Sequence, residues 1–278
     1  MLTGRRFVFV VFALAIAAQS LSAQTIFRYS GFQGDGKNLP TVKDAGPAGN
    51  DGTADATTKL TSDIPTVGVP STAGNRGFNG QAQGGIVSGG TAELLNDAIA
   101  SAGGFTMESW FNWNGAGSIN SIIDYAGTEK LVLDVGAGAG NEVRMRINSD
   151  GSLDSIIGTV NPDEWHYVAS VFDTQGAAVD NGSISGVFRL YLDGNLMNTT
   201  DVLTISNFGD SLNRPIGIAK HPLNFDADRF NGFVFEPRVS LGALNAGELL
   251  YVVPEPAACT MLLGATMLLA LRVRRSSR

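Results

Sequence analysis

Two stretches close together in the chain decide the fold class: EWHYVASVFD at residues 164–173 and VFRLYLDGNLMNT at residues 187–199. In the first, apolar side chains occupy both odd and even positions, which is typical of a strand covered on both faces. In the second, apolar residues recur at every other position from Phe188 to Leu192, the period of a strand with one buried face. The Asp-Gly pair at residues 193–194 tolerates the positive φ of a two-residue turn. Together these features predict a hairpin in the core of a β-sandwich.

The same stretches carry a family resemblance. Trp-His-Tyr-Val-Ala at residues 165–169 and Arg-Leu-Tyr-Leu-Asp-Gly at residues 189–194 resemble the central signature of laminin-G-like domains in the concanavalin A-like lectin/glucanase superfamily. Three more segments are similar to that family in the same order: a loop at residues 44–54, a strand at residues 103–113, and a closing strand and short helix at residues 230–249. The resemblance implies an all-β fold, a two-sheet antiparallel jelly-roll sandwich.

Length and composition agree with one such sandwich at residues 24–250. All-β sandwiches of about 200–250 residues are commonly single domains. Charged residues make up 16% of the 278 residues and glycines number 35, which suits short strands joined by many turns. Residues 92–100 have apolar side chains at helical spacing and predict a short helix over an edge of the sandwich.

Residues 1–23 have the pattern of a secretory signal peptide. Arg5 and Arg6 precede an apolar run at residues 7–18, and small residues follow up to Ala23. We expect cleavage after residue 22 or 23, export through the Sec translocon, and a signal helix that is not part of the sandwich. A short membrane anchor is the alternative, although the apolar run is too short to span a bilayer. The arginine pair also leaves the twin-arginine route open.

The segment at residues 251–278 has three parts. The motif at residues 253–256 contains two prolines that stop a helix and keep the chain extended. An apolar run at residues 257–271 predicts a marginal transmembrane helix. The end at residues 272–278 is basic and would hold the far side of that helix in the cytoplasm. The residues that define these signals are Pro254, Glu255 and Pro256 in the motif and Arg272, Arg274, Arg275 and Arg278 in the basic end.

This arrangement resembles the PEP-CTERM sorting signal of exported bacterial proteins. The resemblance implies that an exosortase recognises the tail and cuts close to the motif. It also implies an inner-membrane intermediate that moves to the cell surface or extracellular matrix of a Gram-negative-type bacterium that makes exopolysaccharide. A plain C-terminal membrane anchor is the alternative.

Cysteine content and charge restrict the function further. The single cysteine, Cys259, lies in the tail, so a processed domain has no disulfide. Loss of the signal peptide and tail leaves 13 basic and 25 acidic residues, a net charge of about −12. Such a charge argues against nucleic acid as a partner.

An enzymatic function is disfavoured. Glycoside hydrolases of the same superfamily use paired carboxylates on one strand, but the chain has no Glu-x-Asp-x-x-Glu run. Glu108 and Glu142 stand alone, and the adjacent pair at residues 163–164 would point to opposite faces of a strand. His166 and His221 accompany no recognisable nucleophile and form no zinc pattern. A divergent glycoside hydrolase or lyase remains the alternative.

Carbohydrate or exopolysaccharide binding is the leading hypothesis, and a purely structural envelope protein is the third. Fold-level analogy suggests a sugar site on the sandwich, where exposed aromatic rings could stack on sugars. We select Trp110, Trp113 and Tyr191 as candidates, although packing in the core or at an edge explains each equally well. Trp165 is interpreted as a core residue.

Calcium is the one cofactor that the resemblance implies. Oxygen-rich loops of the kind that hold Ca²⁺ occur at two places in the chain. The alternative is that these residues only form turns, since Asp and Asn bond to their own backbone. The candidate ligands are Asp44, Asn50 and Asp51 in the first loop and Asn224, Asp226 and Asp228 in the second.

Overall fold

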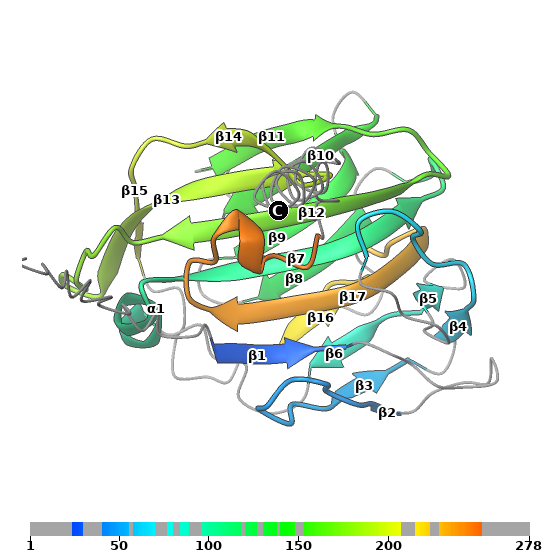
Figure 1. Ribbon diagram of the computed structural model, residues 1–278, viewed down its shortest axis with the longest axis horizontal. Coiled ribbons are helices and arrows are strands. Elements are labelled where there is room, and N and C mark those ends of the chain that lie inside the picture. Colours follow the sequence, from blue (N-terminus) through cyan, green and yellow to red (C-terminus); the bar gives the residue numbers. More distant parts are fainter. Residues whose placement is uncertain are drawn as a thin grey trace, which may run out of the picture.

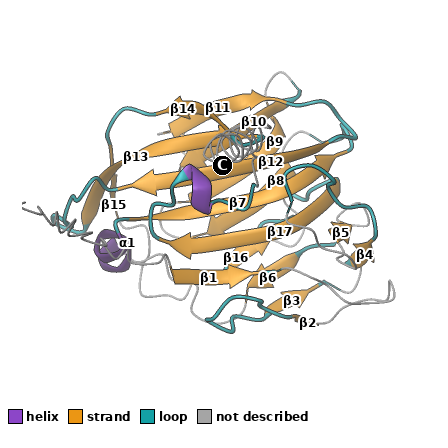
Figure 2. Ribbon diagram, viewed as in Figure 1, coloured by secondary structure: helices purple, strands orange, loops and turns teal. Residues whose placement is uncertain are grey.

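In the computed structural model the chain forms a sandwich of two antiparallel β-sheets, shown in Figures 1 and 2. The predicted all-β, concanavalin A-like sandwich is therefore confirmed. The structure describes residues 24–29, 41–55, 58–69, 77–79, 84–88, 96–117, 120–126, 130–137, 140–147, 153–206, 215–222 and 228–251.

One sheet has nine strands and contains both stretches that predicted the fold. Its strands are paired antiparallel, and two of them lie off the main path of the sheet. In spatial order the strands are β14 (Asn195–Thr199), β13 (Ser183–Leu192), β12 (Trp165–Asp173), β7 (Gly104–Trp113), β17 (Gly232–Leu241), β5 (Gly77–Asn79) and β4 (Lys59–Thr61), with β1 (Gln24–Arg28) and β15 (Leu203–Ser206) off this path.

The other sheet has eight strands, and four of them that are consecutive in the middle of the chain form a meander. In spatial order the strands are β11 (Leu153–Thr159), β10 (Glu142–Ile147), β9 (Lys130–Ala137), β8 (Asn120–Ala126), β16 (Ile216–Ile218), β6 (Ile86–Ser88), β3 (Gly52–Ala54) and β2 (Thr41–Val42).

The predicted hairpin and its Asp-Gly turn are present. Phe172 of β12 lies opposite Phe188 of β13, and their rings pack at 4.9 Å between centroids. Asp193 and Gly194 have φ values of 49° and 77°, and they turn β13 into β14. Both values lie in the left-handed region that a two-residue turn of this kind requires.

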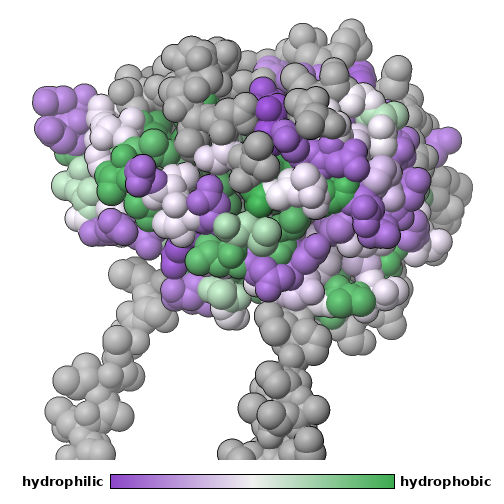
Figure 3. All heavy atoms as spheres, turned by 90° about the horizontal axis from the view of Figure 1, so that it is seen from above, coloured by the Kyte–Doolittle hydropathy of each residue, from purple (hydrophilic) through white to green (hydrophobic). Residues whose placement is uncertain are grey.

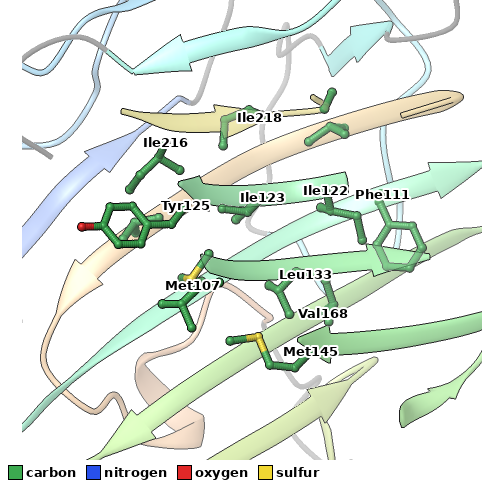
Figure 4. Close-up of a cluster of buried hydrophobic side chains, with 14 of the residues drawn as sticks. Met107, Phe111, Ile122, Ile123, Tyr125, Leu133, Met145, Val168, Ile216 and Ile218 are labelled. Atoms are coloured by element: carbon green, nitrogen blue, oxygen red, sulfur yellow. The ribbon is translucent and has the colours of Figure 1, made fainter. Parts of the chain in front are cut away.

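The main core lies between the two sheets. Alternate residues of the facing strands supply it, as Figure 4 shows for Met107, Leu133, Met145 and Val168. Burial of so many apolar side chains provides the main stabilisation of the fold.

A short helix forms close to the predicted position. The described helix α1 is Asn96–Ala102, and its Ile99 is fully buried. Residues 92–95 of the predicted helix lie outside the described residues.

After β17, residues 242–251 cross the outer face of the nine-stranded sheet, and we call this segment the strap. Figure 1 shows it in orange in front of β7 and β12, with the short helix η1 (Ala246–Glu248) in its middle. The strap and the face beneath it form a second apolar cluster, separate from the main core. Its buried members are Trp110, Tyr167, Ala169, Val171, Tyr191, Phe235, Leu244, Leu249 and Leu250.

The predicted export and sorting segments, residues 1–23 and the tail from residue 252, lie outside the described residues, as does Cys259. Within the ranges that are described, no helix has the length and apolar character needed to cross a membrane. Tyr251, the first residue of the predicted tail segment, packs against the second apolar cluster.

Candidate functional site

The three aromatic residues selected from the sequence are buried. Trp110 and Trp113 are each 2% exposed and Tyr191 is 5% exposed. Trp110 and Tyr191 lie beneath the strap, whereas Trp113 belongs to the main core and donates its indole N–H to the Ala116 carbonyl at 2.9 Å. The interpretation of these rings as exposed sugar-stacking residues is wrong, because the strap and the opposite sheet cover them. The alternative, packing, is correct.

Trp165 shows the opposite outcome. The sequence predicts a core position for Trp165, but this residue is only partly buried at the margin of the second apolar cluster. Its indole N–H donates a hydrogen bond to Asp63 Oδ1 at 3.0 Å, in an exposed position.

Glu108 fastens the strap to the nine-stranded sheet. It is fully buried, and its Oε2 accepts hydrogen bonds from the Leu250 backbone N–H at 2.7 Å and from the Tyr167 hydroxyl. Its Oε1 accepts the Arg238 Nε–H at 2.5 Å. Burial raises the pKa of Tyr167 well above its usual value, and the negative charge of Glu108 raises it further. This carboxylate therefore has a structural role beneath the strap.

The two histidines do not form a site. His166 Nδ1 lies 2.9 Å from Asp193 Oδ2, and the same aspartate accepts the Tyr167 backbone N–H at 2.8 Å. His166 thus holds the Asp193 turn against β12. His221 lies in the segment after β16 and is partly exposed.

The outer face of the eight-stranded sheet carries a set of charged side chains that the sequence patterns did not reveal. In β9, Leu131, Leu133 and Val135 point into the main core, so Asp134 points outward. Neighbouring strands add outward polar residues in two cross-strand rows. We call the set of Ser121, Asp124, Asp134, Arg144 and Arg146 the charged face.

A β-bulge in β8 places two of these residues. The pairing between β8 and β9 shifts between Ser121 and Ile123, and both Ile122 and Ile123 are buried in the main core. Because a bulge turns two consecutive residues inward, Ser121 and Asp124 both face outward. The Ser121 hydroxyl lies 3.4 Å from Asp124 Oδ2, and both residues are fully buried.

Asp134 is the centre of the charged face. Arg146 Nε binds its Oδ2, and Arg144 Nε lies 3.6 Å from its Oδ1. The aspartate is fully buried, while the side chains of Arg144 and Arg146 are 13% and 21% exposed. Burial raises the pKa of Asp134, and the two guanidinium groups oppose this effect without cancelling it. Arg146 Nη2 makes no hydrogen bond within the described residues and is an unused donor.

The predicted calcium ligands of the first loop lie together but do not fit a calcium ion. Asp44 Oδ1 accepts the backbone N–H groups of Arg28 at 2.8 Å and Gly46 at 2.7 Å, and its Oδ2 accepts that of Asn50 at 2.8 Å. Asp51 binds the Asp44 N–H and Lys43. The protein's own donors thus use these carboxylates, as in a turn.

In the second loop, Asn224 and Asp226 lie outside the described residues, and Asp228 accepts the Ser121 N–H at 3.1 Å through its carbonyl. Among the residues whose positions are described, no three His, Cys, Asp or Glu side chains are grouped to hold a metal ion.

Figure 3 views the molecule from above and shows apolar side chains in separate patches between hydrophilic ones. Among the residues that the structure describes, the large apolar side chains that are at least half exposed are Val67, Leu196, Met197 and Val202. They lie on loops and on the edge strand β14.

Comparison with known proteins identifies the fold family. The family model described as the concanavalin A-like lectin/glucanases superfamily matches residues 84–250. No curated protein matches the chain.

Solved structures share this fold at low sequence identity. Domain 4 of AbnA, a GH43 extracellular arabinanase from Geobacillus stearothermophilus solved in complex with arabinotriose, is 15% identical with a TM-score of 0.54, over 84% of this chain and 99% of that chain. The binding domain of botulinum neurotoxin serotype G is 13% identical with a TM-score of 0.51, over 81% of this chain and 49% of that chain. This chain thus matches about half of the toxin domain. At these identities the similarity shows the fold alone.

Proposed function

Because the chain belongs to the concanavalin A-like lectin/glucanase superfamily, we propose that it is an exported protein that binds carbohydrate on the charged face without cleaving it. The polysaccharide of the cell surface or extracellular matrix is the proposed partner.

One observation carries this proposal. The carboxylates of Asp124 and Asp134 are fully buried on the outer face of the eight-stranded sheet, where they do not contribute to the hydrophobic core. Burial of a charge is costly, so a cluster with a perturbed pKa is a candidate for function. The other sheet is closed at its centre by the strap and its apolar cluster. The charged face is therefore the polar surface of the sandwich best suited to a ligand.

The chemistry of these residues suits hydroxyl groups. A sugar hydroxyl both donates and accepts hydrogen bonds, a guanidinium supplies donors in a rigid fork, and a carboxylate supplies acceptors. Arg144 and Arg146 are the partly exposed members, so they are the groups that would contact a ligand directly. Asp134 lies between them and fixes their orientation.

A hydrolytic function has less support. A retaining glycosidase needs one carboxylate free to attack the sugar and a second to protonate the leaving group. Asp134 is bound by two arginines, and Glu108 lies beneath the strap. Domain 4 of AbnA was solved with arabinotriose, which agrees with sugar binding on this fold.

We further propose that residues 1–23 direct export through the Sec translocon and that an exosortase recognises Pro254, Glu255 and Pro256. The sequence patterns of the two segments support this part of the proposal. Replacement of the three motif residues by alanine should block removal of the tail in the native host, detected as a heavier membrane-bound form. Normal processing of that variant would contradict the sorting proposal.

A glycan array followed by a reducing-sugar assay tests the binding proposal. The purified protein should retain at least one glycan class and release no reducing sugar. The double variant Arg144→Gln/Arg146→Gln should bind at least about tenfold more weakly, since charged hydrogen bonds contribute about 1.5–3 kcal/mol each.

The matched control is Arg28→Gln. It breaks another arginine–carboxylate pair, Arg28 Nη2 to Glu236 Oε2 at 2.7 Å, on the nine-stranded sheet, and should leave binding unchanged. Release of reducing sugar, or equal affinity of the double variant and the wild type, would contradict the proposal.

A further inference from the structure

A second polar and aromatic cluster lies on the outer face of the nine-stranded sheet, beside the region that the strap covers. Trp165 of β12, Asn112 of β7 and Phe233 of β17 are direct partners in the sheet register. They share the outer face with Trp110, which is two residues before Asn112. We call these three residues the platform.

The two rings of the platform are partly exposed and lie close together. Their centroids are 6.3 Å apart with an interplanar angle of 28°. A sugar ring held between two aromatic rings needs about 7 Å between the aromatic planes, because each of its two contacts takes about 3.5 Å. A ligand therefore lies across the two rings and not between them.

Asn112 adds a hydrogen-bonding group to the platform. Asn112 is only 6% exposed, and its carboxamide makes no hydrogen bond within the part of the chain that the structure describes. The carboxamide is not one of the solvent-inaccessible groups, so water reaches it although it has no protein hydrogen-bond partner. An amide without one, in register with two partly exposed rings, is a group that a ligand can satisfy.

The platform is also held in position before any ligand binds. Trp165 donates its N–H to Asp63 Oδ1 at 3.0 Å and packs against the second apolar cluster. Fixed aromatic side chains lose little conformational freedom on binding, which favours affinity.

We propose that Trp165, Phe233 and Asn112 form a sugar-stacking site for a neutral saccharide. The apolar face of the sugar ring would lie on the two aromatic rings, and its hydroxyls would bond to Asn112 and Asp63. The charged side chain that Trp165 contacts directly, Asp63, is acidic, so it disfavours uronic acids and sulfated sugars.

The platform and the charged face lie on opposite outer faces of the sandwich. If both bind, one molecule bridges two polysaccharide chains, and linked sites raise the overall avidity. Only this bridging rests on the proposed function of the charged face, while the platform stands on its own residues.

Tryptophan fluorescence provides a direct test. The chain has three tryptophans, and Trp110 and Trp113 are each 2% exposed, so Trp165 is the one that a surface ligand can reach. Arabinotriose, cellotriose and mannotriose are titrated into the purified protein, with trigalacturonate as the acidic probe. At least one neutral trisaccharide should shift the emission and protect it from acrylamide quenching, and trigalacturonate should do so at least about tenfold less well.

Variants distinguish the platform from the charged face. Affinity for the neutral trisaccharide, measured by calorimetry, should fall at least about tenfold in Trp165→Leu and in Asn112→Ala, and Trp165→Phe should retain most of it. The Arg144→Gln/Arg146→Gln variant should keep the wild-type affinity for the neutral trisaccharide. Circular dichroism and thermal unfolding establish whether each variant is folded. If Trp165→Leu does not fold, Asn112→Ala and Trp165→Phe are compared instead.

The proposal is overturned if none of the neutral trisaccharides binds, or if Trp165→Leu and Asn112→Ala bind as the wild type does. Loss of binding only in the arginine variant would also overturn it while supporting the charged face. Loss only in the platform variants would support the platform, and the charged face is then tested by the glycan array alone.

Discussion

Replacement of Glu108 by alanine tests the attachment of the strap. The side chain is fully buried and binds the Tyr167 hydroxyl, the Leu250 N–H and the Arg238 guanidinium. Alanine removes the acceptor for all three groups at once. Arg238 then has no carboxylate partner, although its side chain is only 15% exposed.

These contacts set bounds on how much free energy of unfolding the Glu108→Ala variant loses. Removal of one partner of a buried ion pair typically destabilises a protein by about 3–5 kcal/mol, because the other charge stays buried without compensation. For a domain of this size, 1 kcal/mol shifts the melting temperature by about 2–4 °C. Glu108→Ala should therefore lower the melting temperature by about 6–20 °C. Glu108→Gln keeps the side-chain volume and one acceptor oxygen, so this variant should lose only about 1.5–3 kcal/mol of unfolding free energy.

The assay is urea unfolding followed by circular dichroism, together with limited proteolysis of the folded variants. Strap release should expose a cleavage site within residues 242–251 before the sandwich unfolds. Glu142→Gln is the matched control, since Glu142 lies partly exposed on the other sheet. A loss below about 1 kcal/mol in Glu108→Ala would refute the assigned role, because this is the range of an exposed ion pair.

Three further predictions concern titration, packing and metal binding. Burial raises the pKa of Tyr167 in the folded protein above its usual 10.0, so the protonated hydroxyl stabilises the fold below pH 10 and this stability is lost as the pH rises through the folded-state pKa. Tyr167→Phe should therefore flatten the fall of the urea midpoint at alkaline pH. An unchanged dependence of the urea midpoint on pH would contradict this. Gly68→Ala should destabilise by about 1–3 kcal/mol, since φ is +71° and the new Cβ would lie 2.6 Å from the Tyr251 ring, whereas Gly247→Ala, with nothing within 4 Å, should not. Calcium followed by EDTA should move the melting temperature by less than about 1 °C, because backbone N–H groups occupy Asp44; a larger shift would restore the calcium hypothesis.

Local patterns in the sequence are sufficient to predict the strands. The residue alternation at 164–173 and 187–199 depends only on neighbouring positions, and both stretches form strands of the nine-stranded sheet. The Asp-Gly turn also follows from local chemistry, because the two residues tolerate positive φ wherever they occur. The fold class was therefore predictable before any tertiary contact was known.

Exposure was not predictable in the same way. Trp110 and Trp165 both point to the outer face of the nine-stranded sheet, and alternation assigns them to that face equally well. The strap, more than 130 residues further along the chain, buries Trp110 and leaves Trp165 partly exposed. No local pattern contains that information.

The charged face shows the same division between sequence and tertiary structure. Strict alternation through β8 cannot place both Ser121 and Asp124 outward, and the bulge between them exists only because β9 pairs alongside. The sequence by itself determined the strands, their turns and their apolar faces, since these depend on side chains a few residues apart. Only the tertiary structure decided which outward residues are covered and which polar groups meet, because both depend on segments that are distant in sequence and brought together by packing of the two sheets.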